Sequence, residues 1–260
     1  MNVAVASYNI HRCYGRDGRY DPVRIRKVLR QLGAQVIALQ EVELLHDAPG
    51  LLDFFCEGSS WRSIPGLTMT RANGEYGNAL LTSLPVQSVG RIDLSQPGFE
   101  QRGALRIGLE HHGVQLDVVA THLGLRGRER VLQVKRLLEA IKPDDNPPAD
   151  PAITVLMGDL NEWFRWGRSR HQLREYFDDV ASAATFPSGF PLFPLDRILV
   201  KPPGVLGGIK VIRNEMTRKA SDHLPVVATL GLHSVSDSDK TECVPRVQAD
   251  SASLDRRNGK

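Results

Sequence analysis

Cysteine is scarce in this chain: the 260 residues contain only Cys13, Cys56 and Cys243. The three are widely spaced, and no two of them form a CxxC pair. Disulfide frameworks use even sets of cysteines and zinc clusters use closely paired ones, so the sequence disfavours both. We therefore expect reduced thiols and a cytoplasmic protein.

Long apolar runs are also missing, as is a strong excess of one charge. No run approaches the roughly 20 apolar residues of a membrane span, and Val3–Ala6 is too short for the core of a signal peptide. Any membrane contact should therefore be peripheral. The 33 basic residues exceed the 30 acidic ones by three, which does not fit a dedicated nucleic-acid-binding domain but would not repel an anionic substrate. No obligate protein partner is evident.

The chain is rich in short apolar runs, which predict β-strands. These runs are Val3–Ile10, Val36–Gln40, Asn78–Leu84, Gly103–Leu109, Val114–Thr121, Ile153–Met157, Arg197–Val200, Lys210–Arg213 and Pro225–Leu232. Helical patterns cover Asp21–Gly33, Arg128–Ile141 and Ser169–Phe177. Many strands and few helices in mixed order predict an α/β (α+β) fold in which two packed mixed β-sheets are flanked by helices.

One folded domain is expected over residues 1–233, because a chain of this length fits a single large domain. From Ser234 onward apolar residues become rare, and Ser, Asp, Lys and Arg dominate. Such a segment buries too little apolar surface to offset the entropy lost on ordering. We expect a disordered C-terminal tail over residues 234–260.

The most informative motif is Gly158-Asp159-Leu160-Asn161, which follows an apolar run expected to be a buried strand. Side chains two apart on an extended segment project to one side, so Asp159 and Asn161 should reach the same spot. Further along, Ser221-Asp222-His223 places a carboxylate beside an imidazole at the edge of another apolar strand. Oxygen ligands for a hard cation, with a His that can move a proton, are what metal-assisted attack on a phosphate ester requires.

Other predicted strands end in polar residues too. The first strand ends near Asn9, the second runs into Glu41, and the strand that begins at Val114 runs into His122. Sheet proteins assemble their sites at strand ends, so we expect these side chains to converge. Their oxygen atoms suit Mg²⁺ or Mn²⁺ better than zinc. The oxygen-bearing members are Asn9, Glu41, Asp159, Asn161 and Asp222.

Six short motifs run through residues 1–232: Ser7-Tyr8-Asn9-Ile10-His11, Leu39-Gln40-Glu41-Val42, Thr121-His122-Leu123, Gly158-Asp159-Leu160-Asn161, Leu195-Asp196-Arg197 and Ser221-Asp222-His223. In identity and order they resemble the metal-dependent endonuclease/exonuclease/phosphatase superfamily, which includes DNase I-like nucleases, inositol polyphosphate phosphatases and neutral sphingomyelinases. Further segments resemble a small bacterial branch of that superfamily, namely Gly77-Asn78-Ala79-Leu80-Leu81, His122-Leu123-Gly124-Leu125 and Thr185-Phe186-Pro187.

The resemblance implies a DNase I-like fold, which is a four-layer α/β/β/α sandwich, and a bound Mg²⁺ or Mn²⁺. It implies that Glu41 is the principal metal ligand, with Asn9 and Asp222 nearby. His11 departs from the pattern of several DNA-repair members, which carry an acidic residue two positions after the Asn. A second metal ligand at that place is therefore in doubt, and the departure argues against a repair nuclease.

The resemblance also assigns the residues that would act on the phosphate. Asp159 and Asn161 would position the nucleophilic water and the phosphoryl oxygens. His223, oriented by Asp196, would be the general base or the proton-bearing group at the phosphate. His122 would form a hydrogen bond with a phosphate oxygen. Which of Asp159 and His223 takes the proton of the water differs between accounts of the superfamily and stays open here.

Substrate contacts are expected beside these motifs. Asn78 either orients a metal ligand or serves a turn, and Arg102 either clamps phosphate or pairs with Glu100. Aromatic and basic residues alternate just after Asn161, in the segment Trp163–Arg170. Such a segment could stack bases, rest on a lipid interface, or pack a helix while its arginines stay solvated. Its candidate substrate-binding residues are Trp163, Arg165, Trp166 and Arg168.

Together these patterns predict a divalent-metal-dependent phosphoester hydrolase in which water attacks the phosphorus in line. A lipid head group or a small phosphoester is the favoured substrate. The alternative is a Mg²⁺-dependent nuclease acting on DNA or RNA, for which a more basic chain would be expected. A non-catalytic binding module with the same fold is disfavoured, because Glu41, Asp159 and His223 are all present.

Overall fold

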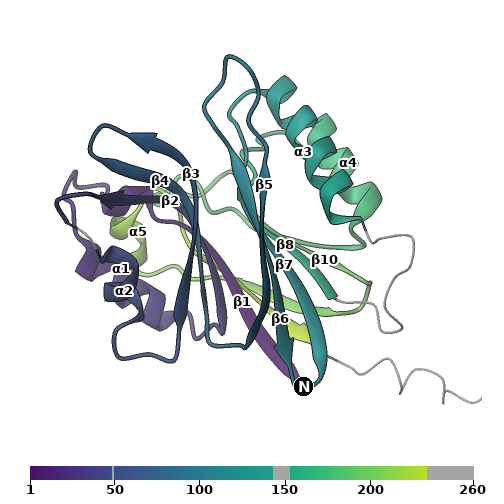
Figure 1. Cartoon of the computed structure of the whole chain (residues 1–260), viewed down its shortest axis with the longest axis horizontal. Coiled ribbons are helices and arrows are strands. Elements are labelled where there is room, and N and C mark those ends of the chain that lie inside the picture. The colour runs from purple at the N-terminus through teal and green to yellow at the C-terminus, as the bar shows by residue number, and fades with distance from the viewer. Residues whose placement is uncertain (49, 143–152, 233–260) are drawn as a thin grey trace, which may run out of the picture.

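Two six-stranded β-sheets packed face to face form the centre of the computed structural model, which describes residues 1–48, 50–142 and 153–232 (Figure 1). The first sheet consists of β1 (Asn2–Asn9), β2 (Val36–Leu45), β3 (Arg62–Arg71), β4 (Gly74–Thr82), β11 (Leu206–Val211) and β12 (Val226–Gly231). The second consists of β5 (Val86–Asp93), β6 (Gly103–His111), β7 (Val114–His122), β8 (Ile153–Asp159), β9 (Asp179–Ser182) and β10 (Asp196–Lys201).

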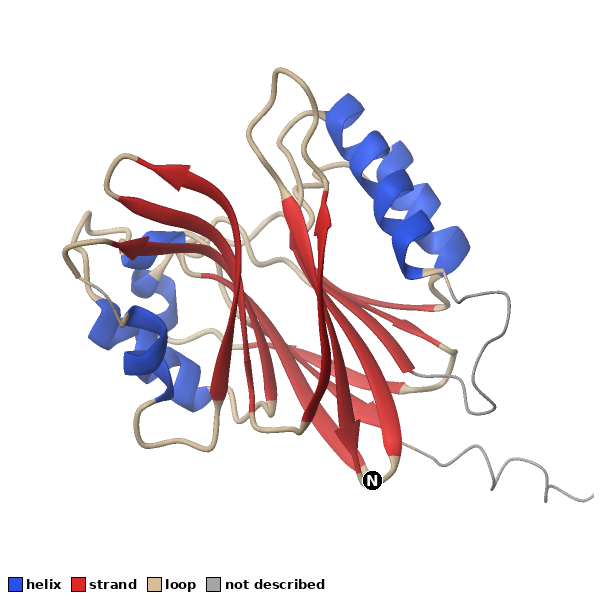
Figure 2. Cartoon of the chain, viewed as in Figure 1, coloured by secondary structure: helices blue, strands red, loops and turns tan. Residues whose placement is uncertain are grey.

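Helices cover the outer face of each sheet, which makes the four-layer α/β/β/α arrangement visible in Figure 2. Beside the first sheet lie α1 (Pro22–Gln31), α2 (Leu51–Cys56) and α5 (Glu215–Ala220). Beside the second lie α3 (Gly127–Ile141) and α4 (Arg168–Tyr176). A single short turn of 3₁₀ helix, η1 (His11–Cys13), follows β1. The predicted fold of two packed mixed sheets with flanking helices is confirmed.

Each sheet contains one parallel pair, and these pairs position the site. The strand orders are β11-β12-β1-β2-β4-β3 and β5-β6-β7-β8-β10-β9. β1 is parallel to β2, and β7 is parallel to β8, whereas the other neighbours are antiparallel. A parallel pair needs a crossover connection, which α1 and α3 supply. Both parallel pairs therefore bring two strand ends to the same edge of their sheet.

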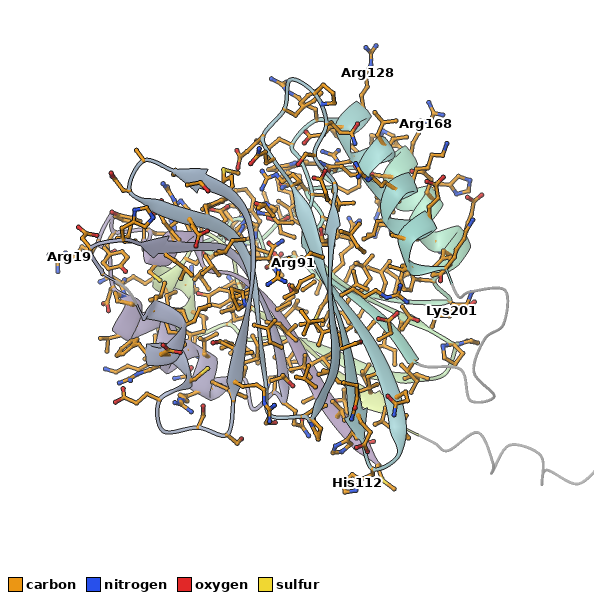
Figure 3. All side chains as sticks on the ribbon, in the orientation of Figure 1. Arg19, Arg91, His112, Arg128, Arg168 and Lys201 are labelled. Carbon is orange, nitrogen blue, oxygen red and sulfur yellow. The ribbon has the colours of Figure 1, made fainter. Side chains whose placement is uncertain are left out.

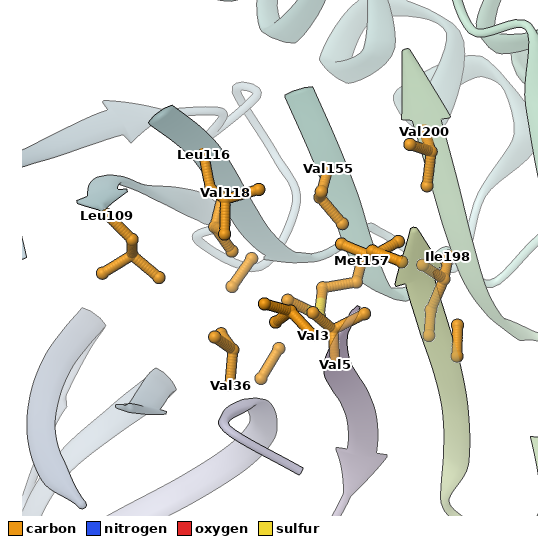
Figure 4. Packing of buried hydrophobic residues seen from close by; sticks show 14 of the residues in the cluster. Val3, Val5, Val36, Leu109, Leu116, Val118, Val155, Met157, Ile198 and Val200 are labelled. Atoms are coloured by element: carbon orange, nitrogen blue, oxygen red, sulfur yellow. The ribbon is translucent and has the colours of Figure 1, made fainter. Parts of the chain in front are cut away.

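The central strands are continuously apolar because both faces of each sheet are covered. In β1, Val3 and Val5 face the other sheet, whereas Tyr8 packs against the helices. In β8, Val155 and Met157 enter the core between the sheets, and Leu156 packs under α3 and α4. Figure 4 shows the core between the sheets, with Val3 and Val5 near Met157. The resulting rigid body holds the strand ends in place.

The predicted helix near residue 21 follows its capping signals. The Asp21 carboxylate accepts a hydrogen bond from the Arg24 backbone N–H at 2.9 Å, and Pro22 occupies the first helical position. Both features are typical of helix starts. Gly33 has a positive φ of 60° just after the helix, a position and conformation in which glycine is favoured.

The sequence failed to predict several elements at the edges of the sheets. β3 contains Pro65 and Gly66, and β5 is largely exposed with no apolar alternation. Edge strands tolerate both features, because one side needs no ladder partner. The strand expected over Lys210–Arg213 also lies earlier in the chain, since β11 covers Leu206–Val211. The short elements α2, β9 and α5 were missed as well, since so few residues give little periodicity.

No helix among residues 1–48, 50–142 and 153–232 is long and apolar enough to cross a membrane. The tail expected over residues 234–260 lies outside the described residues, so its disorder stays a prediction.

Candidate active site

Residues from both sheets line a cleft of about 410 Å³ at the edge where β1, β7 and β8 end. A larger hollow of about 820 Å³ lies between α1 and α5. It contains none of the predicted site residues, and its Arg24 side chain pairs with both Asp17 and Asp21. We take the smaller cleft as the candidate site because the motifs converge there. Predicted residues that line it are Glu41, Arg102, His122, Asp159, Asn161, Trp163, Asp222 and His223.

Glu41 reaches the cleft through an irregularity in β2. The sequence predicted that this strand ends at Glu41, but β2 continues to Leu45. Its pairing with β4 shifts register between Leu39 and Val42, and Glu41 has a φ of 55°. An extra residue in one strand bends it and re-aims side chains. The bulge thus turns Glu41 toward the cleft without ending the sheet.

Asn9 joins the two parallel strand pairs across the molecule. Its side-chain Nδ2 donates to Glu41 Oε1 at 3.0 Å and to Asp159 Oδ2 at 3.1 Å. Its Oδ1 accepts a hydrogen bond from the His11 backbone N–H at 3.0 Å. The amide nitrogen, rather than the oxygen, therefore faces the carboxylates, so in this structure Asn9 positions two acidic groups beside each other.

Asp159 and Asn161 form a tight turn at the end of β8. Asp159 is buried, with 1% of the residue exposed. Its Oδ1 accepts a hydrogen bond from the Asn161 backbone N–H at 2.9 Å. Asn161 has a φ of 49°, and its Nδ2 donates to the Leu123 carbonyl at 2.9 Å. The two side chains meet at one spot, as the motif predicts, although the turn and not a continuing strand brings them there.

His223 is held between carboxylates. Its Nδ1 lies 2.8 Å from Asp196 Oδ2, which also accepts from the Thr185 hydroxyl at 2.5 Å. Its Nε2 lies 3.6 Å from Asp159 Oδ2. Burial alone would lower the pKa of His223, but the charges of Asp196, Asp159 and Asp222 outweigh it and raise the pKa from 6.5 to about 10. The surroundings therefore favour the imidazolium form.

His122 has the opposite environment. Its Nδ1 lies 3.1 Å from Nη1 of Arg102, and its Nε2 lies 3.5 Å from Asp159 Oδ2 and 3.0 Å from Asn161 Nδ2. Burial lowers the pKa of His122, and the Arg102 cation adds to this effect against the opposing charge of Asp159, so the pKa falls from 6.5 to about 3. His122 is therefore neutral in the physiological range.

Asp222 is a partly open acidic residue of the cleft. Its side chain is 37% exposed, and its Oδ1 lies 3.9 Å from His11 Nδ1. Ser221 donates its hydroxyl hydrogen to the Asn9 carbonyl at 2.8 Å, which ties the Asp222 segment to the end of β1. Glu41 and Asp222 thus offer carboxylate oxygens on the same cleft, the type of ligand that Mg²⁺ prefers.

Asp159, Asp196 and His223 also bring possible ligand atoms within 4.8 Å of one another. Both ring nitrogens of His223 already face carboxylates, and the Nδ1 contact has the length of a hydrogen bond. We therefore interpret these three residues as a His–Asp pair next to a second carboxylate. Glu41 and Asp222 are the cleft residues that could hold a metal through oxygen atoms.

Only some of the predicted substrate-binding residues line the cleft. Asn78 lies within β4 and not in a turn; its Nδ2 donates to the Gly103 carbonyl of the other sheet at 3.1 Å. Arg102 contacts His122 and pairs with Glu100 at 3.6 Å. Trp163 lines the cleft and packs against Phe186 and Phe193.

The rest of the aromatic and basic segment lies outside the lining of the cleft. Trp166 is 81% exposed and stacks on Phe164, with ring centroids 5.4 Å apart. Arg165 and Arg168 are exposed, and Arg168 extends away from the body of the molecule (Figure 3). Contact of Arg165, Trp166 and Arg168 with a substrate stays a prediction.

A buried charged group that the sequence did not single out supports this segment. Glu162 accepts hydrogen bonds from the Phe164 backbone N–H at 3.2 Å and from the Ser169 hydroxyl, and its Oε1 lies 3.4 Å from Nη2 of Arg130. Arg197 donates to the Glu162 carbonyl at 2.8 Å. Buried charges are generally paired, but which distant residues pair is not visible in the sequence. The place of Glu162 directly after Asn161 was the one available signal.

Comparison with known proteins agrees with this geometry. The model of the endonuclease/exonuclease/phosphatase family matches residues 6–223, which span every motif at the cleft. The chain belongs to the endonuclease/exonuclease/phosphatase family. It is 28% identical over 247 residues to the uncharacterized protein YbhP of Escherichia coli K12, covering 88% of this chain and 96% of that one.

Solved structures of endonuclease/exonuclease/phosphatase proteins share the fold. One from Bacteroides vulgatus matches with a TM-score of 0.73 at 17% identity, covering 90% of this chain and 100% of that one. One from Beutenbergia cavernae matches with a TM-score of 0.72 at 22% identity, covering 89% and 72%. D. rerio TDP2 complexed with a single-strand DNA product matches with a TM-score of 0.64 at 17% identity, covering 89% and 99%.

Proposed function

We propose that this protein is a divalent-metal-dependent phosphoester hydrolase. The observation that carries the proposal is the meeting of two kinds of group in one cleft. The carboxylates of Glu41, in β2, and of Asp222, in the segment before β12, face it. Asp159 lies between His122 and a His223–Asp196 pair. Carboxylates suited to a hard cation beside a proton-bearing imidazole are what hydrolysis of a phosphate ester needs.

The donor set fits Mg²⁺ or Mn²⁺ because the lining of the cleft offers carboxylate oxygens and no cysteine. Glu41 and Asp222 would hold the ion, with Asn9 beside it keeping Glu41 in place. A bound cation would supply Lewis-acid polarisation of a phosphoryl oxygen and stabilise the leaving oxygen.

Asp159 and Asn161 at the end of β8, with His223 from the segment before β12, would act on the water and the phosphate. Asp159 and Asn161 would orient the attacking water, since both side chains are fixed by the turn after β8. His223 would carry the proton at the phosphate, because Asp196 holds its Nδ1 and the surrounding carboxylates favour the charged ring. Asp159 is then the better acceptor for the proton of the water.

We propose a phospholipid head group or a small phosphoester as the substrate. The stacked pair Phe164–Trp166 is exposed close in sequence to Asn161. Arg165 lies between the two aromatic residues, and Arg168 begins α4 just after them. Exposed aromatic side chains favour the interface of a membrane, and arginines pair with phosphates. This loop would rest among head groups as a peripheral contact while the cleft holds the scissile phosphate.

A nuclease activity is the alternative. Arg12, Arg71 and Arg102 line the cleft, and D. rerio TDP2, which has the same fold, has been crystallised with a single-strand DNA product. These arginines could follow a nucleic-acid backbone. The small net charge of +3 weakens this alternative.

One panel of assays tests the proposal. Purified protein with Mg²⁺ or Mn²⁺ would be offered phospholipid vesicles, inositol phosphates, small phosphodiesters and monoesters, plasmid DNA and RNA. Cleavage of a lipid or small phosphoester that EDTA abolishes is the expected result. Preferential cleavage of DNA or RNA would support the nuclease. Binding of these substrates without any hydrolysis would favour the non-catalytic module.

A further inference from the structure

The two cleft histidines differ in the group that faces Nδ1. Asp196 Oδ2 faces Nδ1 of His223 at 2.8 Å, whereas Nη1 of Arg102 faces Nδ1 of His122 at 3.1 Å. A carboxylate only accepts hydrogen bonds, and a guanidinium only donates them. The Nδ1 atom of His223 must therefore bear a proton, and the Nδ1 atom of His122 must offer a lone pair.

A second hydrogen-bond donor, the side-chain amide of Asn161, faces the other ring nitrogen of His122. Asn161 Nδ2 lies 3.0 Å from His122 Nε2, and it also donates to the Leu123 carbonyl at 2.9 Å. A neutral imidazole has one donor and one acceptor nitrogen, so His122 cannot accept from both Arg102 and Asn161. The bond from the charged Arg102 is the stronger of the two, since charge-assisted hydrogen bonds are about twice as strong as neutral ones.

The Asp159 carboxylate also favours the tautomer of His122 that carries its proton on Nε2. Its Oδ2 lies 3.5 Å from His122 Nε2 and can accept a hydrogen bond from an Nε2–H, whereas an Nδ1–H would face the buried Arg102 cation. Arg102 itself is 6% exposed, and Glu100 pairs with its other terminal nitrogen at 3.6 Å. The guanidinium is therefore held in place from both sides.

We propose that Arg102 fixes His122 as the neutral tautomer with its proton on Nε2, so that His122 serves as a hydrogen-bond donor to a phosphoryl oxygen and not as a base. Arg102 is then a positioning residue: it acts through His122, and His122 rather than Arg102 contacts the phosphate. The donor role rests on the proposed function, whereas the tautomer does not.

The tautomer can be measured in the resting protein by ¹⁵N NMR of labelled histidine, in which protonated and bare ring nitrogens have distinct shifts. The spectrum of H122Q identifies the signals of His122 among the eight histidines. We expect a bare Nδ1 and a protonated Nε2. A protonated Nδ1 in the native protein would overturn the proposal, whatever the activity of the enzyme.

Variants of Arg102 then test the cause. R102M should lose the preference for Nε2–H, and R102K, which keeps a cationic donor, should retain it. E100Q is the matched control, because it removes the ion pair of Arg102 but not its contact with His122, and it should leave the tautomer unchanged. An unchanged tautomer in a folded R102M would overturn the role of Arg102. If R102M does not fold, a protonated Nδ1 of His122 in the native protein or in R102K would still overturn the proposal.

Kinetics separate positioning from substrate binding once a cleaved phosphoester is known. Partners that orient a site residue through a hydrogen bond are typically worth roughly 10- to 100-fold, so R102M should lower kcat by that factor with little change in KM. A raised KM at unchanged kcat would mean that Arg102 clamps phosphate directly, against the proposal. If no phosphoester is cleaved, the proposed function fails while the NMR result still judges the tautomer.

Discussion

The unit β1–α1–β2 in the first sheet and the unit β7–α3–β8 in the second share one backbone plan. Each is a parallel pair with its crossover helix on the outer face, and each continues into two antiparallel strands on the same side of its sheet. The side chains differ where the parallel pairing of each unit ends: Asn9 and Glu41 in the first, His122 and Asp159 in the second. The shared plan decides where side chains meet, and their identity decides what each unit contributes.

The two units also differ in how the chain leaves the site. β2 passes Glu41 through a bulge and continues to Leu45, so the proposed metal ligand is held inside a sheet. β8 ends at Asp159, and the chain turns into the loop that carries Phe164 and Trp166. A ligand that must keep its geometry lies on the rigid unit, and the surface that would select a substrate lies on the loop, where variation is tolerated.

The largest expected effect falls on the first unit. EDTA should abolish activity, and Mg²⁺ or Mn²⁺ should restore it. Glu41→Ala should raise the Mg²⁺ concentration for half-maximal activity by roughly tenfold or more, because even partners of metal ligands contribute 10- to 100-fold. Glu43→Gln is the control: Glu43 lies on the same strand but pairs with Arg71 at 3.7 Å. Full activity in EDTA would refute the metal site.

The next largest effect concerns His223, which lies in the segment between α5 and β12 and is oriented by Asp196 of the second sheet. His223→Gln should leave metal affinity unchanged in calorimetry and lower kcat by roughly 10²- to 10⁴-fold, the usual contribution of a general acid–base group. His171→Gln, on the exposed face of α4, should have no effect. A mild phenotype for His223→Gln would show that another group moves the proton.

A smaller effect should separate His122 from His223. His122→Leu removes a hydrogen-bond donor, which costs on the order of 10²-fold in kcat where such a donor faces a developing charge. His122→Gln restores a donor near the position of Nε2 and should recover much of that loss. Gln at position 223 should recover none, because it cannot carry the proton. Equal losses for Gln and Leu at position 122 would contradict the donor role.

The smallest effect should lie on the loop that only the second unit has. Replacing both Phe164 and Trp166 by Ala should raise KM severalfold for a phosphoester presented in vesicles and spare a small soluble one, because apolar contact with the interface is lost. Leu132→Ala is the control, being an exposed apolar residue on α3. If Arg165→Gln and Arg168→Gln instead weaken DNA binding and flatten its salt dependence, the loop serves a nuclease.

Much of this site could be predicted from local patterns. Continuous apolar runs marked the central strands because both faces of each sheet are buried, and polar residues at the ends of those runs marked Asn9, His122 and Asp159. The Asp21 cap, Pro22 and Gly33 marked the first helix for equally local reasons. Periodicity of this kind is a property of neighbours in the chain, so one sequence is enough to read it.

The tertiary structure decided what neighbours in the chain cannot. The bulge at Glu41 depends on pairing with β4, and the duplicated plan of the two sheets leaves no short repeat in the sequence. The opposite environments of the two histidines arise from Arg102 and Asp196, which lie 20 and 27 residues from their partners. Protonation of a buried imidazole depends on the charges packed against it, and only the folded chain brings those charges together.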